Sequence, residues 1–281
     1  MLPFSIGSVL RQTFSDFEIL VIGDGCTDDS QAVVQAVKDE RVRWVDLQPN
    51  SGHQSTPNNE GLKQARGQLI AYLGHDDLWL PHHLQCLTRE IANGSDLAHG
   101  ITGKVSVDGN TIEPLPFPPT YERGLWIPPT GVVHKRELAE KLGGWRNYRE
   151  LEVDPEVDLW LRAYDADYRL TFVPRVTALK FPAKYRRNAY KTRSSTEQSH
   201  WTKRIINEPD FEVAALMMML MPMLEEKKLA RKHILYKDLV QQFYSETCKR
   251  ALARLPIANA NSNSNKKGAV IDEARKYKGL G

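Results

Sequence analysis

The sequence predicts an α/β protein with a doubly wound sheet, and three observations support this. Apolar runs at residues 17–23, 41–47 and 68–73 have the length and composition of buried strands. Segments with helical spacing of apolar residues separate these runs, at 30–40 and 58–66. Polar residues follow each apolar run. Alternation of strand and helix over about 75 residues favours a mostly parallel sheet covered by helices.

The overall composition bounds the class of protein. A chain of 281 residues is long enough for one large domain with a core of its own and an appendage. The net charge of +3 is too small to predict nucleic acid as a partner. The cysteines Cys26, Cys86 and Cys248 are odd in number and far apart, so they indicate neither disulfides nor a metal site. A reducing, cytoplasmic location is expected.

The longest apolar run, residues 213–224 (VAALMMMLMPML), is too short to span a bilayer and contains Pro222. It predicts a buried helix face. A peripheral contact with the inner face of the membrane is the alternative.

The first half of the chain can be followed element by element. Residues 1–13 have the character of a helix, and FEILVIG (17–23) reads as a buried strand. DGCTDDS supplies turn residues and a helix cap for 30–40. After the strand at 41–47 and the loop at 48–57, the helix at 58–66 leads into the strand at 68–73.

The second half is expected to be α+β. The Asp-Gly turn in SVDGNTI (106–112) predicts a hairpin. The remaining predicted elements are a strand, a helix and a Gly-Gly stop within 124–145, a helix at 153–166 with Asp154 as N-cap, two strands at 168–174 and 176–181, and long helices at 210–225 and 228–255. The tail that follows has low complexity.

Polar and acidic side chains gather at the ends of the predicted strands. Asp24 follows the first strand, the loop at 50–52 follows the second, and Asp76 and Asp77 follow the third. Ligands of doubly wound sheets bind outside the carboxyl ends of the strands. Burying a carboxylate costs roughly several kcal/mol unless it is paired or bound to a metal. The pattern therefore indicates a site for a cation with a phosphate-bearing ligand.

Several ordered motifs resemble the family 2 glycosyltransferases with the GT-A fold. They are SVLRQTFSDFEILVIGDGCTDDS, NSG, NNEGLKQARGQLIAYLGHDDLWLPHHL, GVVHKRELAEKLGGW and PEVDLWLRAYDADYRLTFVP, and they cover residues 8–182. The resemblance implies a Rossmann-like mixed sheet flanked by helices, here with a C-terminal helical extension. It divides the chain into a GT-A domain at 1–205 (a nucleotide-sugar half, 1–95, and an acceptor half, 96–205), a helical extension at 206–257 and a disordered tail at 258–281.

The resemblance also implies an activity. Members of the family transfer a sugar, usually with inversion, from a nucleoside diphosphate sugar to an acceptor hydroxyl. The expected acceptor is a glycan or a lipid-linked molecule in surface polysaccharide, glycolipid or glycan synthesis. A divalent cation, Mn²⁺ or Mg²⁺, neutralises the diphosphate leaving group.

Matching positions receive the family's roles. Asp24 is expected to read the nucleotide base, Asn59 to contact the nucleotide sugar, and Asp76 to hold the ribose. Asp77 is the expected metal ligand, and Asp76 is the alternative because the register of the pair is open.

The catalytic candidates lie in the segment that resembles the family's EDxDLW run. Glu156 is the expected general base, and Asp158 is the second catalytic candidate. Both stand in the first turn of a predicted helix, where acidic residues are stabilising without any catalytic role.

Departures from the family pattern leave alternatives open. Gly23 and Gly74 stand where most members have carboxylates, and the family's first strand is absent before residue 1. A gap in the sheet is expected there, from a mis-assigned start or a truncation. A degenerate, non-catalytic nucleotide-sugar-binding protein is the alternative. A nucleotidyltransferase is disfavoured because no Gly-rich basic loop opens the chain.

Overall fold

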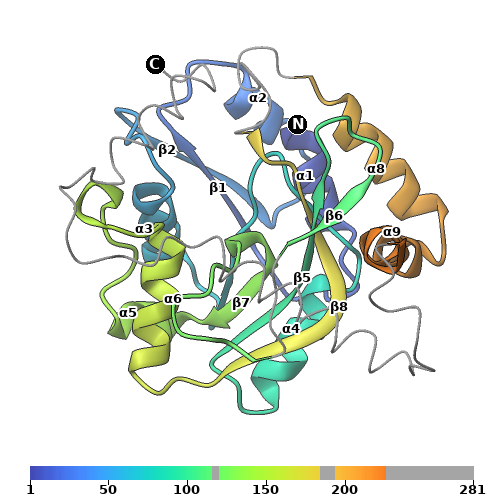
Figure 1. Ribbon diagram of the computed structural model, residues 1–281. Coiled ribbons are helices and arrows are strands. Elements are labelled where there is room, and N and C mark those ends of the chain that lie inside the picture. The colour runs from blue at the N-terminus through green and yellow to red at the C-terminus, as the bar shows by residue number, and fades with distance from the viewer. Residues whose placement is uncertain (116–119, 184–193, 226–281) are drawn as a thin grey trace.

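The computed structural model describes residues 1–115, 120–183 and 194–225 (Figure 1). The predicted helix at 228–255 and the tail at 258–281 lie outside these residues. The helices are α1 (Leu2–Leu10), α2 (Ser30–Gln35), α3 (Ser55–Gln64), α4 (His83–Ala92), α5 (Arg136–Lys141), α6 (Pro155–Asp165), α8 (Thr196–Asn207) and α9 (Phe211–Glu225), with 3₁₀ turns η1 (Pro129–Gly131) and η2 (Tyr148–Glu150). The strands are β1 (Ile19–Asp24), β2 (Val42–Leu47), β3 (Leu69–Ala71), β4 (Leu78–Trp79), β5 (Leu97–Val105), β6 (Ile112–Pro114), β7 (Val132–Lys135) and β8 (Leu170–Lys180).

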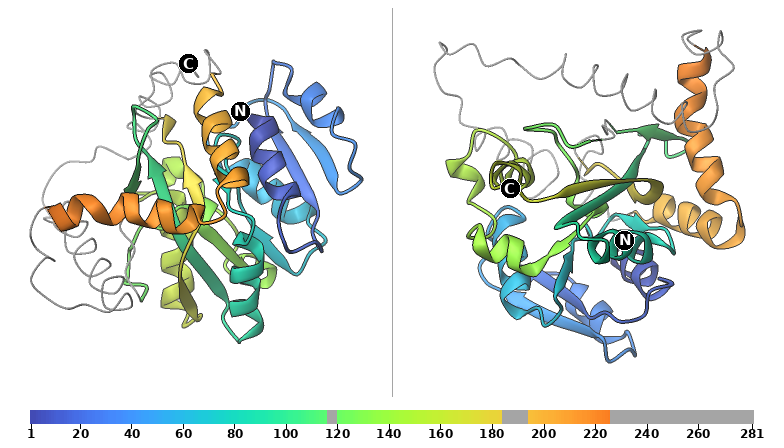
Figure 2. Two further views of the ribbon diagram at one scale, coloured as in Figure 1. Left: turned by 90° about the vertical axis from the view of Figure 1, so that its right-hand side faces the viewer. Right: turned by 90° about the horizontal axis from the view of Figure 1, so that it is seen from below.

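The strands form two sheets. A parallel pair, β1 and β2, stands apart from a six-stranded mixed sheet. Five strands of this larger sheet follow the order β3-β7-β5-β8-β4, and β6 pairs with the C-terminal end of β5. Within the larger sheet β5 and β8 are parallel, and the other pairs are antiparallel. Figure 2 shows β1, β2 and α2 at one end of the molecule and α9 at the opposite end. The expected mixed α/β architecture is confirmed.

The sheet breaks beside β1. The sequence predicts that the first three strands share one sheet, but β1 bonds to β2 and β3 bonds to β7. No described strand bridges the two sheets, and Ile19, Leu20, Val21 and Ile22 of β1 all stay partly exposed. The prediction of a single sheet is therefore wrong, and the break lies where a gap is expected.

A second correction concerns β8, which is one strand where the sequence predicts two. Pro174 interrupts the pattern because it has no N–H to donate to a ladder. In the structure, Gly100 of β5 pairs with Val173 and the next residue, Ile101, pairs with Val176. Pro174 and Arg175 are therefore skipped in the pairing, and β8 continues past them. The strand continues to Lys180, so this lysine stands at a strand end next to the start of β4.

Helices α8 and α9 are packed into the main core. Trp201 of α8 and Phe211, Ala215 and Met219 of α9 belong to one buried cluster with Ile101 and other residues of the sheet. The predicted helix at 210–225 is confirmed as α9. The predicted start of a separate extension, residue 206, falls inside α8, and the division into domains stays a prediction.

Candidate active site

Asp24 holds two strand-end loops together. At the end of β1 its Oδ1 accepts the backbone N–H of Ser51 and its Oδ2 accepts the Ser51 hydroxyl, both at 2.9 Å. Gly25 has φ +65°, and a Cβ there would lie 2.4 Å from the backbone nitrogen of Asn50. Only glycine fits this approach. The expected meeting of Asp24 with the loop at 50–52 is therefore present, and base recognition by Asp24 stays a prediction.

Asp77 is completely buried and fully hydrogen-bonded. Its Oδ1 accepts the backbone N–H of Phe181 at 3.0 Å. Its Oδ2 accepts the Thr130 hydroxyl at 2.5 Å and lies 3.1 Å from the ammonium of Lys180. The free-energy cost of burying this carboxylate is thus offset by the ion pair with Lys180 and by the hydrogen bonds from Thr130 and Phe181.

Asp76 lies beside Asp77 and is half-buried. Burial raises the pKa of its carboxyl, attraction to His75 opposes the rise, and repulsion from Asp77 adds to it. The two carboxylates face one point: a Cβ on Gly74 would lie 3.1 Å from Asp76 Oδ1 and 3.0 Å from Asp77 Oδ2. Glycine at this position leaves room for both.

The residues around Asp77 do not fit a resident Mn²⁺ or Mg²⁺. Both cations bind carboxylate oxygens that are free to coordinate. Both oxygens of Asp77 already accept protein donors, and one of them is paired with the positive charge of Lys180. A divalent cation at Asp77 has to displace this lysine, because like charges repel strongly at such distances.

Glu156 is a buried carboxylate aimed by two side chains. It is 8% exposed, its Oε1 accepts the indole N–H of Trp126 at 2.9 Å, and its Oε2 accepts the amide of Gln54 at 2.8 Å. Burial raises the pKa of Glu156, repulsion from Asp154 adds to the rise, and the Trp126 hydrogen bond opposes it. A carboxylate with a raised pKa is suited to accept a proton near neutral pH.

Asp158 has different surroundings although it stands two residues further along α6. Its oxygens contact Arg162 at 2.7 Å and Arg146 at 3.2 Å. Arg162 also donates to the backbone carbonyl of Gly144 at 2.7 Å. Asp158 therefore anchors the loop that follows α5. Because the oxygens of Asp158 are engaged by two guanidinium groups that hold this loop, Glu156 suits the role of base better than Asp158 does.

Asn59 of α3 is hydrogen-bonded to the loop that follows α5. Its amide donates to the backbone carbonyl of Trp145 and accepts the Trp145 N–H, each at 2.8 Å. It also lines a polar pocket of about 210 Å³, together with Ser51, His53, Ser55, Thr56, Trp145, Asn147, Tyr148 and Arg149. The predicted contact of Asn59 with the nucleotide sugar stays a prediction.

The partners of the predicted carboxylates could not be identified from the sequence. Gln54, Trp126, Thr130 and Lys180 come from loops and strand ends that carry no acidic motif. Lys180 alone left a usable signal, since it is a charged residue near the end of the last apolar strand predicted, at 176–181.

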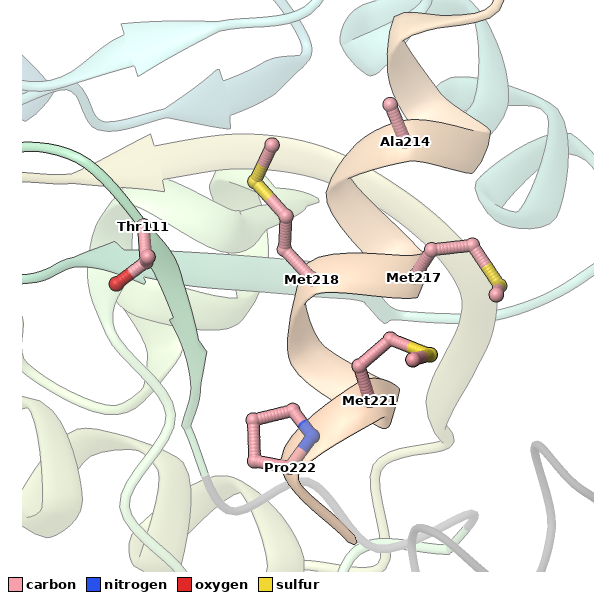
Figure 3. Close-up of a pocket in the computed structure, with 6 residues that line it drawn as sticks. All are labelled: Thr111, Ala214, Met217, Met218, Met221 and Pro222. Atoms are coloured by element: carbon pink, nitrogen blue, oxygen red, sulfur yellow. The ribbon is translucent and has the colours of Figure 1, made fainter. Parts of the chain in front are cut away.

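An apolar groove of about 480 Å³ lies along α9, away from these carboxylates (Figure 3). Met218 lies on the side of α9 nearer Thr111, with its side chain directed along the helix, whereas Met217 and Met221 point away from Thr111. Met217 is 46% exposed and Met221 is 43% exposed.

None of the helices in the described residues is long and apolar enough to cross a membrane.

Comparison with known proteins places the chain among glycosyltransferases. Residues 1–140 match the model of glycosyl transferase family 2. An uncharacterized glycosyltransferase of Nostoc sp. is 34% identical over 156 residues, which are 49% of this chain and 48% of that protein.

A second relative is WfgD of Escherichia coli, described as a UDP-Glc:alpha-D-GlcNAc-diphosphoundecaprenol beta-1,3-glucosyltransferase. It is 30% identical over 125 residues, 43% of this chain and 48% of WfgD. The chain thus spans about half the length of these relatives.

The fold has a solved counterpart. The crystal structure of S. aureus TarS 1-349 in complex with UDP-GlcNAc superposes with a TM-score of 0.57 at 16% identity, covering 99% of this chain and 84% of that one. This likeness shows the GT-A fold. The match over residues 1–140 shows that the chain belongs to glycosyltransferase family 2.

Proposed function

We propose that this protein transfers a sugar from a nucleoside diphosphate sugar to an acceptor hydroxyl, with inversion at the anomeric carbon. The observation that carries the proposal is the setting of Glu156. Gln54 and Trp126 hold this buried carboxylate, and it lies close enough to Lys180 for electrostatic attraction, as do Asp76 and Asp77. A candidate base and a candidate donor site therefore share one corner of the fold.

The proposed reaction is a single displacement. Glu156 takes the proton of the acceptor hydroxyl as that oxygen bonds to the anomeric carbon. The bond between the anomeric carbon and the β-phosphate oxygen breaks, and its electron pair leaves with the nucleoside diphosphate. Attack on the face opposite the leaving group inverts the anomeric configuration.

The donor is proposed to lie along the strand ends. Asp24 with Ser51 contacts the base, Asp76 contacts the ribose, and Asn59 lines the adjoining polar pocket. The TarS complex with UDP-GlcNAc and the UDP-Glc donor in the name of WfgD support a nucleoside diphosphate sugar. The diphosphoundecaprenol in that name supports a lipid-linked acceptor, with a glycan as the alternative.

The Mn²⁺ or Mg²⁺ that the family resemblance predicts at Asp77 and Asp76 stays a prediction. When bound to a diphosphate, such a cation neutralises charge on the leaving group. The proposed reaction does not depend on it, because the oxygens of Asp77 are occupied by Thr130, Lys180 and Phe181.

Donor binding is tested by thermal shift with a panel of nucleoside diphosphate sugars, with Mn²⁺ and with EDTA. At about 100 times the dissociation constant, a true donor should stabilise the protein by about 2.7 kcal/mol. Asp24→Ala should reduce the shift. Asp39→Ala is the control, because Asp39 pairs with its neighbour Arg41 just before β2 begins, at the opposite end of the strand from Ser51. No shift with any donor refutes the proposal.

A non-catalytic nucleotide-sugar-binding protein is the second candidate. The observation that favours it is at Gly23, where a Cβ would lie 2.2 Å from the ring of Trp44. The indole thus fills the space in which most family members have a carboxylate. Both candidates bind the donor, so only turnover separates them.

We further propose a peripheral membrane contact through α9, consistent with a cytoplasmic protein acting at the inner face of a membrane. Val213, Met217 and Met221 form an exposed apolar row with i, i+4 spacing. The sequence directly after α9 contains Lys227, Lys228, Arg231 and Lys232, which complement anionic headgroups.

The membrane contact is tested by sedimentation with vesicles. The protein should sediment with phosphatidylglycerol vesicles and much less with phosphatidylcholine vesicles. The double variant M217S/M221S should lose most of this binding, whereas Ile206→Ser, at an exposed apolar residue of α8, should not. Equal binding by the double variant and the parent contradicts the proposal.

A further inference from the structure

Lys180 occupies a defined place opposite the acidic pair. Leu78 of β4 pairs with Leu179 of β8 in an antiparallel register. Asp77 precedes Leu78 and Lys180 follows Leu179, so the two charged residues stand opposite each other one position beyond this pair. The ammonium lies 3.1 Å from Asp77 Oδ2, and the lysine side chain is 27% exposed. It is therefore fixed by the sheet and still reachable from solvent.

The positive charge of Lys180 interacts with several carboxylates of the predicted site. Burial alone lowers the pKa of Lys180, but attraction to Asp77 and Asp76 outweighs this effect and raises the pKa above its ordinary value. Glu156 adds a smaller attraction. The ammonium thus faces three carboxylates, which include the candidate base.

A diphosphate entering this corner meets strong repulsion unless a cation accompanies it. Gly74 keeps the acidic cluster to two carboxylates where a third is common in the family. One ammonium then offsets a larger share of the negative charge. The side chain of Lys180 can donate two further N–H groups while it keeps its bond to Asp77.

We propose that Lys180 binds the donor diphosphate and supplies the positive charge that the family pattern assigns to a divalent cation, so that donor binding does not require a metal. The inference rests on the proposed function. In the reaction, the electron pair released from the anomeric carbon onto the β-phosphate oxygen is stabilised by the Lys180 ammonium, which keeps its proton.

The test measures binding of five nucleoside diphosphates (UDP, GDP, ADP, CDP and dTDP) by calorimetry, in EDTA and in Mn²⁺. The parent protein should bind one of them in EDTA, with a dissociation constant within about threefold of that in Mn²⁺. Lys180→Met should weaken binding at least about tenfold in EDTA, and Lys180→Arg should restore most of it.

Lys135→Met is the matched control. Lys135 ends β7 and pairs with Asp96 at 2.8 Å with 32% of its side chain exposed, which resembles the Lys180–Asp77 pair at another place in the same sheet. This variant should bind as the parent does. Circular dichroism checks that each variant is folded.

The outcomes separate the two proposals. Binding that needs Mn²⁺ in the parent, or that is unchanged in Lys180→Met, overturns the role of Lys180 and leaves the proposed function standing. No binding of any of the five nucleotides under either condition overturns the proposed function, and the role of Lys180 fails with it.

Discussion

Two acidic residues of α6, Glu156 and Asp158, show how neighbours on one helix can take separate roles. Both stand in the first turn, where the helix dipole favours negative charge. Glu156 accepts two neutral N–H donors, whereas Asp158 is enclosed by Arg146 and Arg162. The sequence offers both as candidates because the difference arises from side chains far away in the chain.

Asp158→Asn tests the structural role of that residue. The substitution removes the charge that pairs with Arg162, whose side chain is 14% exposed. Removing one partner of a buried pair costs about 3–5 kcal/mol, and the retained amide oxygen should reduce this to about 2–3 kcal/mol. Urea unfolding measures the change. Parent-like stability combined with lost turnover contradicts the assignment and moves the base to Asp158.

His99 of β5 is a buried side chain that packs against the ring of Phe172. Both ring nitrogens lack a hydrogen bond among the described residues, and burial lowers the pKa of His99 to about 3. The unfolded chain takes up a proton below about pH 6.5, and the folded protein does not. The folded state therefore loses stability at this residue as the pH falls below about 6.5.

His99→Leu should remove this pH dependence. The free energy of unfolding of the variant, relative to the parent, should rise by about 1.4 kcal/mol for each pH unit below 6.5. At pH 8 the variant should already be more stable, because two unpaired buried nitrogens cost about 1–3 kcal/mol. Chemical unfolding at pH 8, 6 and 5 measures both effects. A parallel pH dependence in parent and variant contradicts the account.

Among the elements, the turn after α5 is tied to α3 by the hydrogen bonds between Asn59 and the Trp145 backbone. Gly143 and Gly144 both have positive φ, at +78° and +73°. A Cβ on Gly143 meets nothing within 4 Å, whereas a Cβ on Gly144 lies 2.5 Å from Asn59 Oδ1. An alanine at Gly143 would therefore meet backbone strain alone, whereas an alanine at Gly144 would meet the same strain and also a steric clash with Asn59.

Gly144→Ala should destabilise the protein more than Gly143→Ala. The backbone strain costs about 1–2 kcal/mol in each variant. Only Gly144→Ala also displaces the amide of Asn59 from the Trp145 backbone, and the loss of those hydrogen bonds adds about 1–3 kcal/mol. Urea unfolding of both variants gives the comparison. Equal destabilisation contradicts the role assigned to Asn59 in holding this turn.

The strands show what local patterns can and cannot predict. Apolar runs located β1, β2 and β3 within one or two residues, because each run is bounded by polar turns. Pro174 suggested a strand end, but the ladder to β5 tolerates it through a shifted register. Pairing is decided by contacts across the sheet, so the separation of β1 from β3 does not follow from either strand's own sequence.

At the scale of the whole molecule, the acidic residues at the strand ends could be predicted from the sequence, but the lysine that pairs with them could not. Asp24, Asp76 and Asp77 stand out because carboxylates after buried strands are unusual. Lys180 follows Asp77 by 103 positions and becomes its partner only through the pairing of β4 with β8. Gln54 and Trp126, the two hydrogen-bond donors to Glu156, are likewise distant from it in the chain and reach it only through the packing of the fold.

The central claim is that Glu156 acts as the base in sugar transfer from a donor bound at this edge. The most direct test is the rate at which nucleoside diphosphate is released from the best-bound donor, for the parent and for Glu156→Gln. The parent should release nucleoside diphosphate, and the variant should release it about 10²–10⁴-fold more slowly, with donor affinity nearly unchanged. Equal rates for the two proteins, or no release by the parent with any bound donor, would contradict it.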